Sequence, residues 1–99
     1  MNTDTSPVKI NEKARRFELH VGDDVAYIDF GWHKETLALL YVYVPVAFRG
    51  KGYSSTLIEY AMQYARDKNV KVMVYCSYIN RYLRMHPEHD DVLVKTSSQ

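Results

Sequence analysis

The 99-residue sequence has little of three features that define large classes of protein: cysteine, net charge and long apolar runs. Its single cysteine, Cys76, excludes an internal disulfide framework and suits a reducing compartment. Thirteen basic and twelve acidic residues leave a formal net charge of +1, which removes the usual electrostatic argument for nucleic acid or an anionic membrane as partner. No run is long enough to cross a bilayer, and the polar start has no signal-like stretch. We therefore expect a soluble cytoplasmic protein.

The sequence does have enough apolar material for a stable core. Apolar residues make up 46% of the chain, which lacks the low hydrophobicity and high charge of disordered proteins. The length suits one domain, which we expect at residues 8–95. Residues 1–7 and 96–99 are rich in Ser, Thr, Asn and Gln, and we expect both tails to be flexible.

The first half of the chain has the patterning of strands. Residues 17–21 alternate between apolar and polar side chains, which predicts a half-buried strand. Gly-Asp-Asp at residues 22–24 signals a turn before a second strand at residues 25–32, so these strands form a hairpin. Polar residues 33–35 then precede residues 36–44, whose nearly continuous apolar run predicts a central strand covered on both faces.

The second half begins with a helical period. Residues 51–68 place their apolar side chains on one stripe, and Asn69 is a plausible C-terminal stop. Residues 70–75 then read as another buried strand, which completes a β-α-β unit with two parallel, adjoining strands. We expect Ser77 to cap a short second helix that ends near His86, because the residue before proline disfavours helical geometry.

These elements define an α/β fold with a mixed sheet: antiparallel N-terminal strands, one β-α-β crossover and a short second helix. A last short strand is expected at residues 92–94.

The turn between the central strand and the long helix has the composition of an anion site. Gly50 and Gly52 bracket Lys51, and glycine permits close approach of the backbone to a phosphate. Unpaired N–H groups at the helix start attract an anion, and Arg49 and Lys51 add positive charge. The spacing matches neither a Walker loop nor the dinucleotide fingerprint, whose third glycine position is occupied by Ser55. A solvated turn is the alternative.

With its flanks, the segment Val-Pro-Val-Ala-Phe-Arg-Gly-Lys-Gly at residues 44–52 resembles the coenzyme A signature of the GNAT superfamily of N-acetyltransferases. Gly50 and Gly52 match that signature, whereas Ala47 stands where it has Gln or Arg. The resemblance covers residues 36–76, and the later segment is similar to a short, stand-alone acetyltransferase-like subfamily.

The resemblance implies that acetyl-CoA is the cofactor and that an amine on a small molecule or peptide is the acceptor. The pyrophosphate would lie on Arg49, Gly50, Lys51 and Gly52, and the pantetheine arm would pair with Tyr43 and Val44. The Val44 N–H would face the thioester carbonyl and stabilise the oxyanion formed by direct attack of the amine. A non-catalytic module that binds or senses acetyl-CoA is the second hypothesis, favoured by Ala47 and by an absent tyrosine pattern.

The sequence leaves the assignment of the catalytic groups open. The superfamily's usual Tyr-x-x-x-Gly-Phe pattern is absent, which leaves Tyr78 and Tyr82 as candidates for the acid that protonates the leaving thiolate. Cys76 follows the second parallel strand, where it would either line the pocket or accept acetyl transiently, with His86 as a possible base. No general base can be assigned.

The run from His86 to Asp91 is similar in composition to a metal-ligand cluster. It contains no His-Glu-x-x-His helix, and Pro87 breaks the helix that would align the two imidazoles. We therefore expect a polar loop and no metal site.

Overall fold

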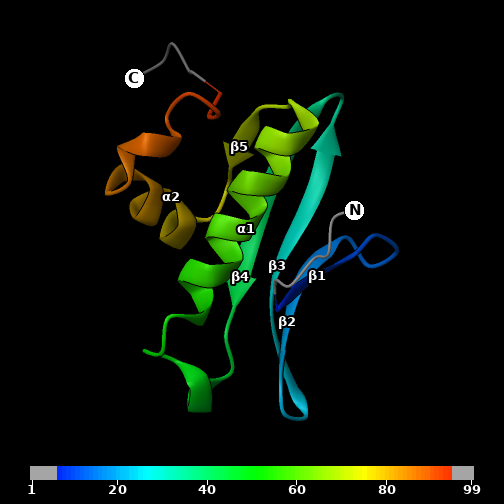
Figure 1. Cartoon of the computed structure of the whole chain (residues 1–99), viewed down its shortest axis with the longest axis vertical. Helices are drawn as coiled ribbons and strands as arrows, with labels where there is room; N and C mark the ends of the chain where they lie inside the picture. The colour runs from blue at the N-terminus through cyan, green and yellow to red at the C-terminus, as the bar shows by residue number, and fades with distance from the viewer. Residues whose placement is uncertain (1–6, 95–99) are drawn as a thin grey trace.

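The chain folds into one five-stranded mixed sheet with a long helix across one face (Figure 1). The computed structural model describes residues 7–94. Its elements are β1 (Val8–Asn11), β2 (Arg16–Val21), β3 (Asp24–His33), β4 (Thr36–Tyr43), the 3-10 helix η1 (Val46–Phe48), α1 (Tyr53–Lys68), β5 (Val72–Val74), α2 (Ser77–Arg84) and the 3-10 helix η2 (Pro87–His89). The strands stand in chain order, antiparallel from β1 to β4 and parallel between β4 and β5. The predicted mixed sheet with one crossover is confirmed.

The core lies between the sheet and α1. Alternate residues of the strands point to one side, so Phe17 on β2 and Phe30 on β3 are both buried, with ring centroids 4.7 Å apart. The ring of Phe17 also meets the edges of Tyr60 and Tyr64 on α1. The helix contributes its predicted apolar stripe, whose members Leu57, Ile58, Ala61 and Ala65 are fully covered, and Met62 is buried as well. Burial of this stripe fixes α1 against the sheet.

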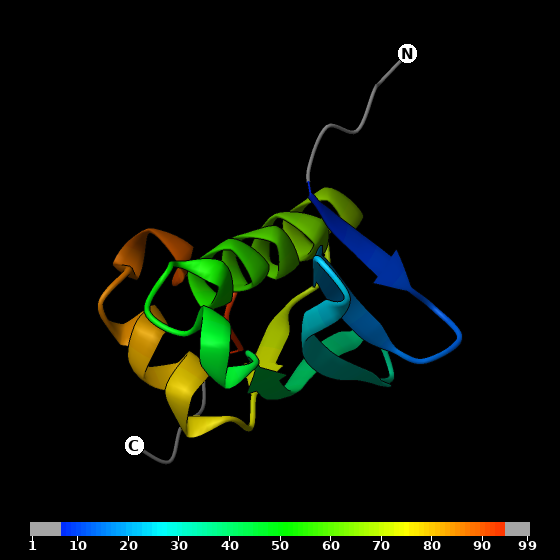
Figure 2. The ribbon, with the colours of Figure 1, turned by 90° about the horizontal axis from the view of Figure 1, so that it is seen from below.

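The second helix lies beside α1, on the side away from β1 (Figure 2). Ile79 and Leu83 stand one turn apart and are buried, which docks α2 onto the same core. The helix ends at Arg84, two residues before the expected end. Ser77 is its first helical residue and not its cap, because the N-cap position is taken by the extended Cys76. The prediction of a Ser77 cap was therefore wrong.

Other boundaries also differ from the expected ones. The long helix starts at Tyr53 and not at residue 51, because Gly52 has a left-handed φ of 87° that a helix does not continue. Asn69 ends it in the left-handed conformation, as predicted. The strand β1 was not anticipated; four residues are too few for a clear alternation. Residues 92–94 form no strand, since only Leu93 makes a bridge, to Val72.

Of the two predicted tails, residues 1–6 and 96–99 lie outside the described residues, as does residue 95. Within the part described, no helix is long and apolar enough to span a membrane.

Candidate functional site

The two parallel strands of the sheet separate after three residue pairs. Leu37, Ala38 and Leu39 pair with Val72, Met73 and Val74, and the Tyr75 N–H donates to the Leu39 carbonyl at 2.9 Å. After this point β4 continues to Tyr43, paired with β3 on its other side, while the chain after β5 turns into α2. The edge of β4 from Leu40 to Tyr43 that faces away from β3 is therefore not covered by β5.

The start of α1 faces the same region. The first internal hydrogen bond at this end is from the Thr56 N–H to the Gly52 carbonyl, at 3.1 Å. The N–H groups of Tyr53, Ser54 and Ser55 therefore have no acceptor within the helix, and they carry the positive end of its dipole. No acidic side chain lies in the first turn. This end of α1 is suited to an anion.

The glycines preceding α1 hold the turn in a conformation that other residues adopt at a cost. Gly50 and Gly52 have φ angles of 78° and 87°. A Cβ atom built at either position would meet no atom within 4 Å, so both face open space. Glycine is needed here for its backbone conformation, and the open space leaves the backbone accessible to a ligand.

A cavity of about 590 Å³ lies between the free edge of β4, the turn and the start of α1. Among the residues predicted as a cofactor site, Tyr43, Val44, Arg49, Gly50 and Gly52 line this cavity. Lys51 does not line it, although it lies between the two glycines and is exposed. None of the lining residues is acidic.

Arg49 is the one cationic side chain among the lining residues. Its Nε donates a hydrogen bond to the Val44 carbonyl at 2.8 Å, which ties the turn back to the end of β4. The two terminal nitrogens of the guanidinium keep donors for a further anionic partner.

Tyr78 is the one predicted catalytic residue that lines the cavity. It lies in the first turn of α2, is 49% exposed, and its hydroxyl is 3.0 Å from the Ser54 hydroxyl on α1. This contact joins the starts of the two helices across the mouth of the cavity.

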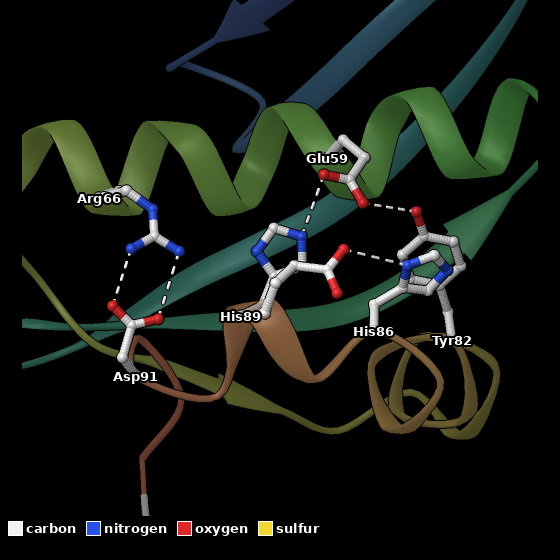
Figure 3. A network of polar contacts seen from close by, with 7 residues as sticks. Glu59, Arg66, Tyr82, His86, His89 and Asp91 are labelled. Carbon is white, nitrogen blue, oxygen red and sulfur yellow. Dashed lines mark hydrogen bonds and ion pairs between the residues drawn. The ribbon is translucent and has the colours of Figure 1, made fainter.

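Cys76 and Tyr82 are not among the lining residues. Cys76 is half-buried and packs against the core, which favours the packing role over the acetyl-carrying one. Tyr82 instead donates to Glu59 Oε2 at 2.5 Å (Figure 3). Burial and this hydrogen bond to a carboxylate raise the pKa of Tyr82 to about 12, which weakens it as an acid.

Sequence reasoning did not single out the aromatic part of the lining. Tyr41, Phe48 and Tyr53 line the cavity together with Tyr43 and Tyr78. Phe48 and Tyr53 meet edge to face, with ring centroids 6.0 Å apart. Tyr53 has the spacing of the helix's apolar stripe, and Phe48 and Tyr41 carry no local signal that separates a lining residue from a core residue.

The comparisons with known proteins agree with this geometry. A family model described as GCN5-related N-acetyl-transferase matches residues 16–92. Protein NATD1 of Xenopus tropicalis is 35% identical over 54 residues, which are 54% of this chain and 50% of that protein. The match thus spans about half the length of this relative. The NMR solution structure of a GCN5-like protein from Staphylococcus aureus has a TM-score of 0.69 and 19% identity, covering 98% of this chain and 96% of its own.

The chain belongs to the GCN5-related N-acetyltransferase family. The predicted superfamily is confirmed, and so is the fold.

Proposed function

We propose that this chain binds acetyl-CoA in the cavity and transfers the acetyl group to an amine by direct attack. One observation carries the proposal: the cavity joins the anion-attracting start of α1 to the uncovered edge of β4. A long cofactor with a charged pyrophosphate and an amide-bearing arm needs both kinds of partner, and both are backbone groups here.

In this proposal the pyrophosphate accepts hydrogen bonds from the turn at residues 49–52 and from the first N–H groups of α1. The terminal nitrogens of Arg49 add a charged contact. The amides of the pantetheine arm pair with the free edge of β4 at Tyr43 and Val44, in the manner of an added strand.

The acetyl transfer follows from this placement. The nitrogen of a neutral amine attacks the thioester carbon, a C–N bond forms, and the carbonyl electrons move to oxygen, where the Val44 N–H stabilises the charge. Collapse of the intermediate breaks the C–S bond and the thiolate takes a proton from the acid of the site, while the proton lost by the attacking nitrogen passes to solvent water, from which the acid regains its own. Of the four tyrosines that line the cavity, Tyr78 is the one on α2, and we assign it the role of acid to the thiolate.

A non-catalytic binding module is the second candidate function. No carboxylate or imidazole is among the residues that line the cavity, so none of them is a ready base for the acceptor. Under this alternative the protein binds acetyl-CoA and transfers nothing.

The binding half of the proposal is tested by titrating labelled protein with acetyl-CoA and observing amide resonances by NMR. The largest shifts are expected at Val44, Gly50, Gly52 and Ser54. Arg49→Ala should weaken binding roughly tenfold or more, the value of a lost charged hydrogen bond. Arg84→Ala removes an exposed arginine from α2 outside the cavity and should bind as the parent does. Shifts confined to other parts of the sheet would contradict the placement.

The transfer half is tested by a screen of primary amines in which release of free thiol is followed. With an active acceptor, Tyr78→Phe should lower turnover by about 10²-fold, the usual contribution of a general acid, with binding retained. Tyr75→Phe is the matched control, because Tyr75 is exposed and close in sequence but does not line the cavity. Binding without thiol release for any amine would favour the second candidate function.

A further inference from the structure

A second group of polar side chains joins the middle of α1 to the segment that follows α2 (Figure 3). It consists of Glu59, Tyr82, His86, Glu88 and His89. None of these residues lines the cavity described above. The group is therefore a separate feature of the molecule.

Three of these side chains converge on one point. Glu59, Glu88 and His89 each offer one ligand atom, and the three atoms lie within 4.8 Å of one another. Glu59 Oε1 and His89 Nε2 are already 3.0 Å apart. Ligands at about 2.0–2.1 Å from a tetrahedral ion are separated by roughly 3.3 Å, so only Glu88 has to move closer. Its side chain is 61% exposed, so solvent leaves room for this movement.

Each carboxylate is oriented by a partner of its own. The Tyr82 hydroxyl holds Glu59 Oε2, which leaves Oε1 toward His89. His86 Nδ1 lies 3.3 Å from Glu88 Oε2. Hydrogen bonds of this kind, made to the far side of a ligating group, orient the ligands of protein metal sites and raise their affinity.

The imidazole of His89 is the buried member of the group, with 9% of the residue exposed. Its Nδ1 is buried and has no hydrogen-bond partner in the described part of the chain. The Nε2 atom faces Glu59, so a metal ion bound at Nε2 leaves the ring hydrogen on Nδ1, where no described residue accepts it. Binding through Nε2 therefore carries the cost of one buried N–H group, which the bonds from the ion to its three ligands must exceed.

We propose that Glu59, Glu88 and His89 bind one divalent transition-metal ion of the zinc class. One imidazole nitrogen with two carboxylate oxygens suits Zn²⁺ or Co²⁺ better than Mg²⁺ or Ca²⁺, which prefer oxygen ligands alone. The two carboxylate charges balance the ion, and three protein ligands leave the fourth position to water. The bound ion replaces the hydrogen bond between Glu59 and His89, with the ring hydrogen of His89 on Nδ1, and fastens η2 to α1.

This inference departs from the expectation that the run from His86 to Asp91 holds no metal. That expectation treated the run as self-contained, with Pro87 preventing its two histidines from aligning. The structure adds Glu59 from α1, thirty residues before His89, and only one of the two histidines faces it.

The test uses the full chain, free of affinity tags and treated with EDTA, which is titrated with ZnCl₂ by calorimetry and with CoCl₂ by visible absorption. We expect one equivalent of Zn²⁺ with saturable heat, and cobalt bands at the intensity of four-coordinate sites. Glu59→Gln and Glu88→Gln should each weaken binding at least tenfold, since even outer partners of ligands contribute about 10–100-fold. Glu88 is exposed, so its variant keeps the test independent of folding.

His20→Gln is the matched control. His20 lies 3.2 Å from Glu18 on β2, in another histidine–glutamate pair, which has no third ligand among the described residues. This variant should bind Zn²⁺ as the parent does. The proposal is overturned by absence of saturable one-to-one binding in the parent, by parent affinity in either glutamate variant, or by loss of binding in His20→Gln.

Discussion

Gly52 determines how the backbone amides of α1 are presented to the cavity. It caps the helix without a side-chain hydrogen bond, in the left-handed conformation. Because nothing lies within 4 Å of an added Cβ atom, substitution costs the backbone strain alone. We predict that Gly52→Ala lowers the free energy of unfolding by about 1 kcal/mol, the cost of the left-handed conformation for an ordinary residue.

Gly52→Asn is the control for this prediction, because asparagine tolerates the left-handed region. Urea unfolding should place it between the parent and Gly52→Ala. If Gly52→Ala is as stable as the parent, the turn does not hold the conformation described.

The raised pKa of Tyr82 leads to a prediction about the stability of the fold at alkaline pH. Burial and Glu59 raise its pKa to about 12, so the folded state favours the protonated phenol more than the unfolded state does. The stabilisation is fully present below the ordinary pKa of about 10 and is lost as the pH rises toward 12. In EDTA, titration of phenolate absorbance should show a tyrosine that ionises last.

That late phase should be missing from Tyr82→Phe. Tyr78→Phe should retain it, because Tyr78 is exposed and contacts only a neutral hydroxyl in the contacts described. Loss of the late phase from Tyr78→Phe would show that the wrong phenol has been assigned to Glu59.

At the scale of elements, the periodicity of the apolar residues predicted which side chains face the core. The stripe of α1 and the alternation of β2 follow directly from which side chains face the core, and both were found. The boundaries of the helices and strands were harder to predict, because each depends on the backbone conformation of a single residue. The left-handed Gly52 shortens α1 at its start, and β5 ends where its pairing with β4 ends, at Val74.

The candidate site likewise has a part that the sequence could predict and a part that it could not. The turn at residues 49–52 could be predicted because its glycines and basic residues adjoin in sequence. The wall formed by Tyr41, Phe48 and Tyr53 could not, because it draws on three elements whose relative positions only tertiary packing sets. The pairing of Glu59 with His89 is hidden for the same reason.

The segment after η2 makes one further element-scale prediction. The Val94 N–H donates to the Val72 carbonyl at 2.9 Å, and the Val72 N–H donates to the Val92 carbonyl at the same distance. Val94→Pro removes the first of these donors and should lower the free energy of unfolding by about 1 kcal/mol, the net worth of one hydrogen bond.

Val94→Ala keeps the donor and is the control, measured in the same urea titration. A Val94→Pro protein as stable as Val94→Ala would mean that the bridge to β5 contributes nothing to the fold.

At the scale of the whole molecule, the order of the strands has a consequence for the time course of folding. The pairs from β1 to β4 join neighbours in the chain through short turns, whereas β5 reaches β4 only after residues 44–71 have been laid down. Contacts that close short loops form early, so the antiparallel part should assemble in the folding transition state and the β4–β5 join after it.

The cavity lies beyond the end of the β4–β5 pairing, between β4 and elements that follow it in the chain. A ligand held there stabilises contacts absent from the transition state, and such contacts slow unfolding without hastening folding. In stopped-flow experiments with urea, saturating acetyl-CoA should therefore lower the unfolding rate and leave the refolding rate unchanged. Faster refolding would mean that the cleft is already formed at the barrier. If the refolding rate stays constant, the ligand concentration determines how long each molecule remains folded.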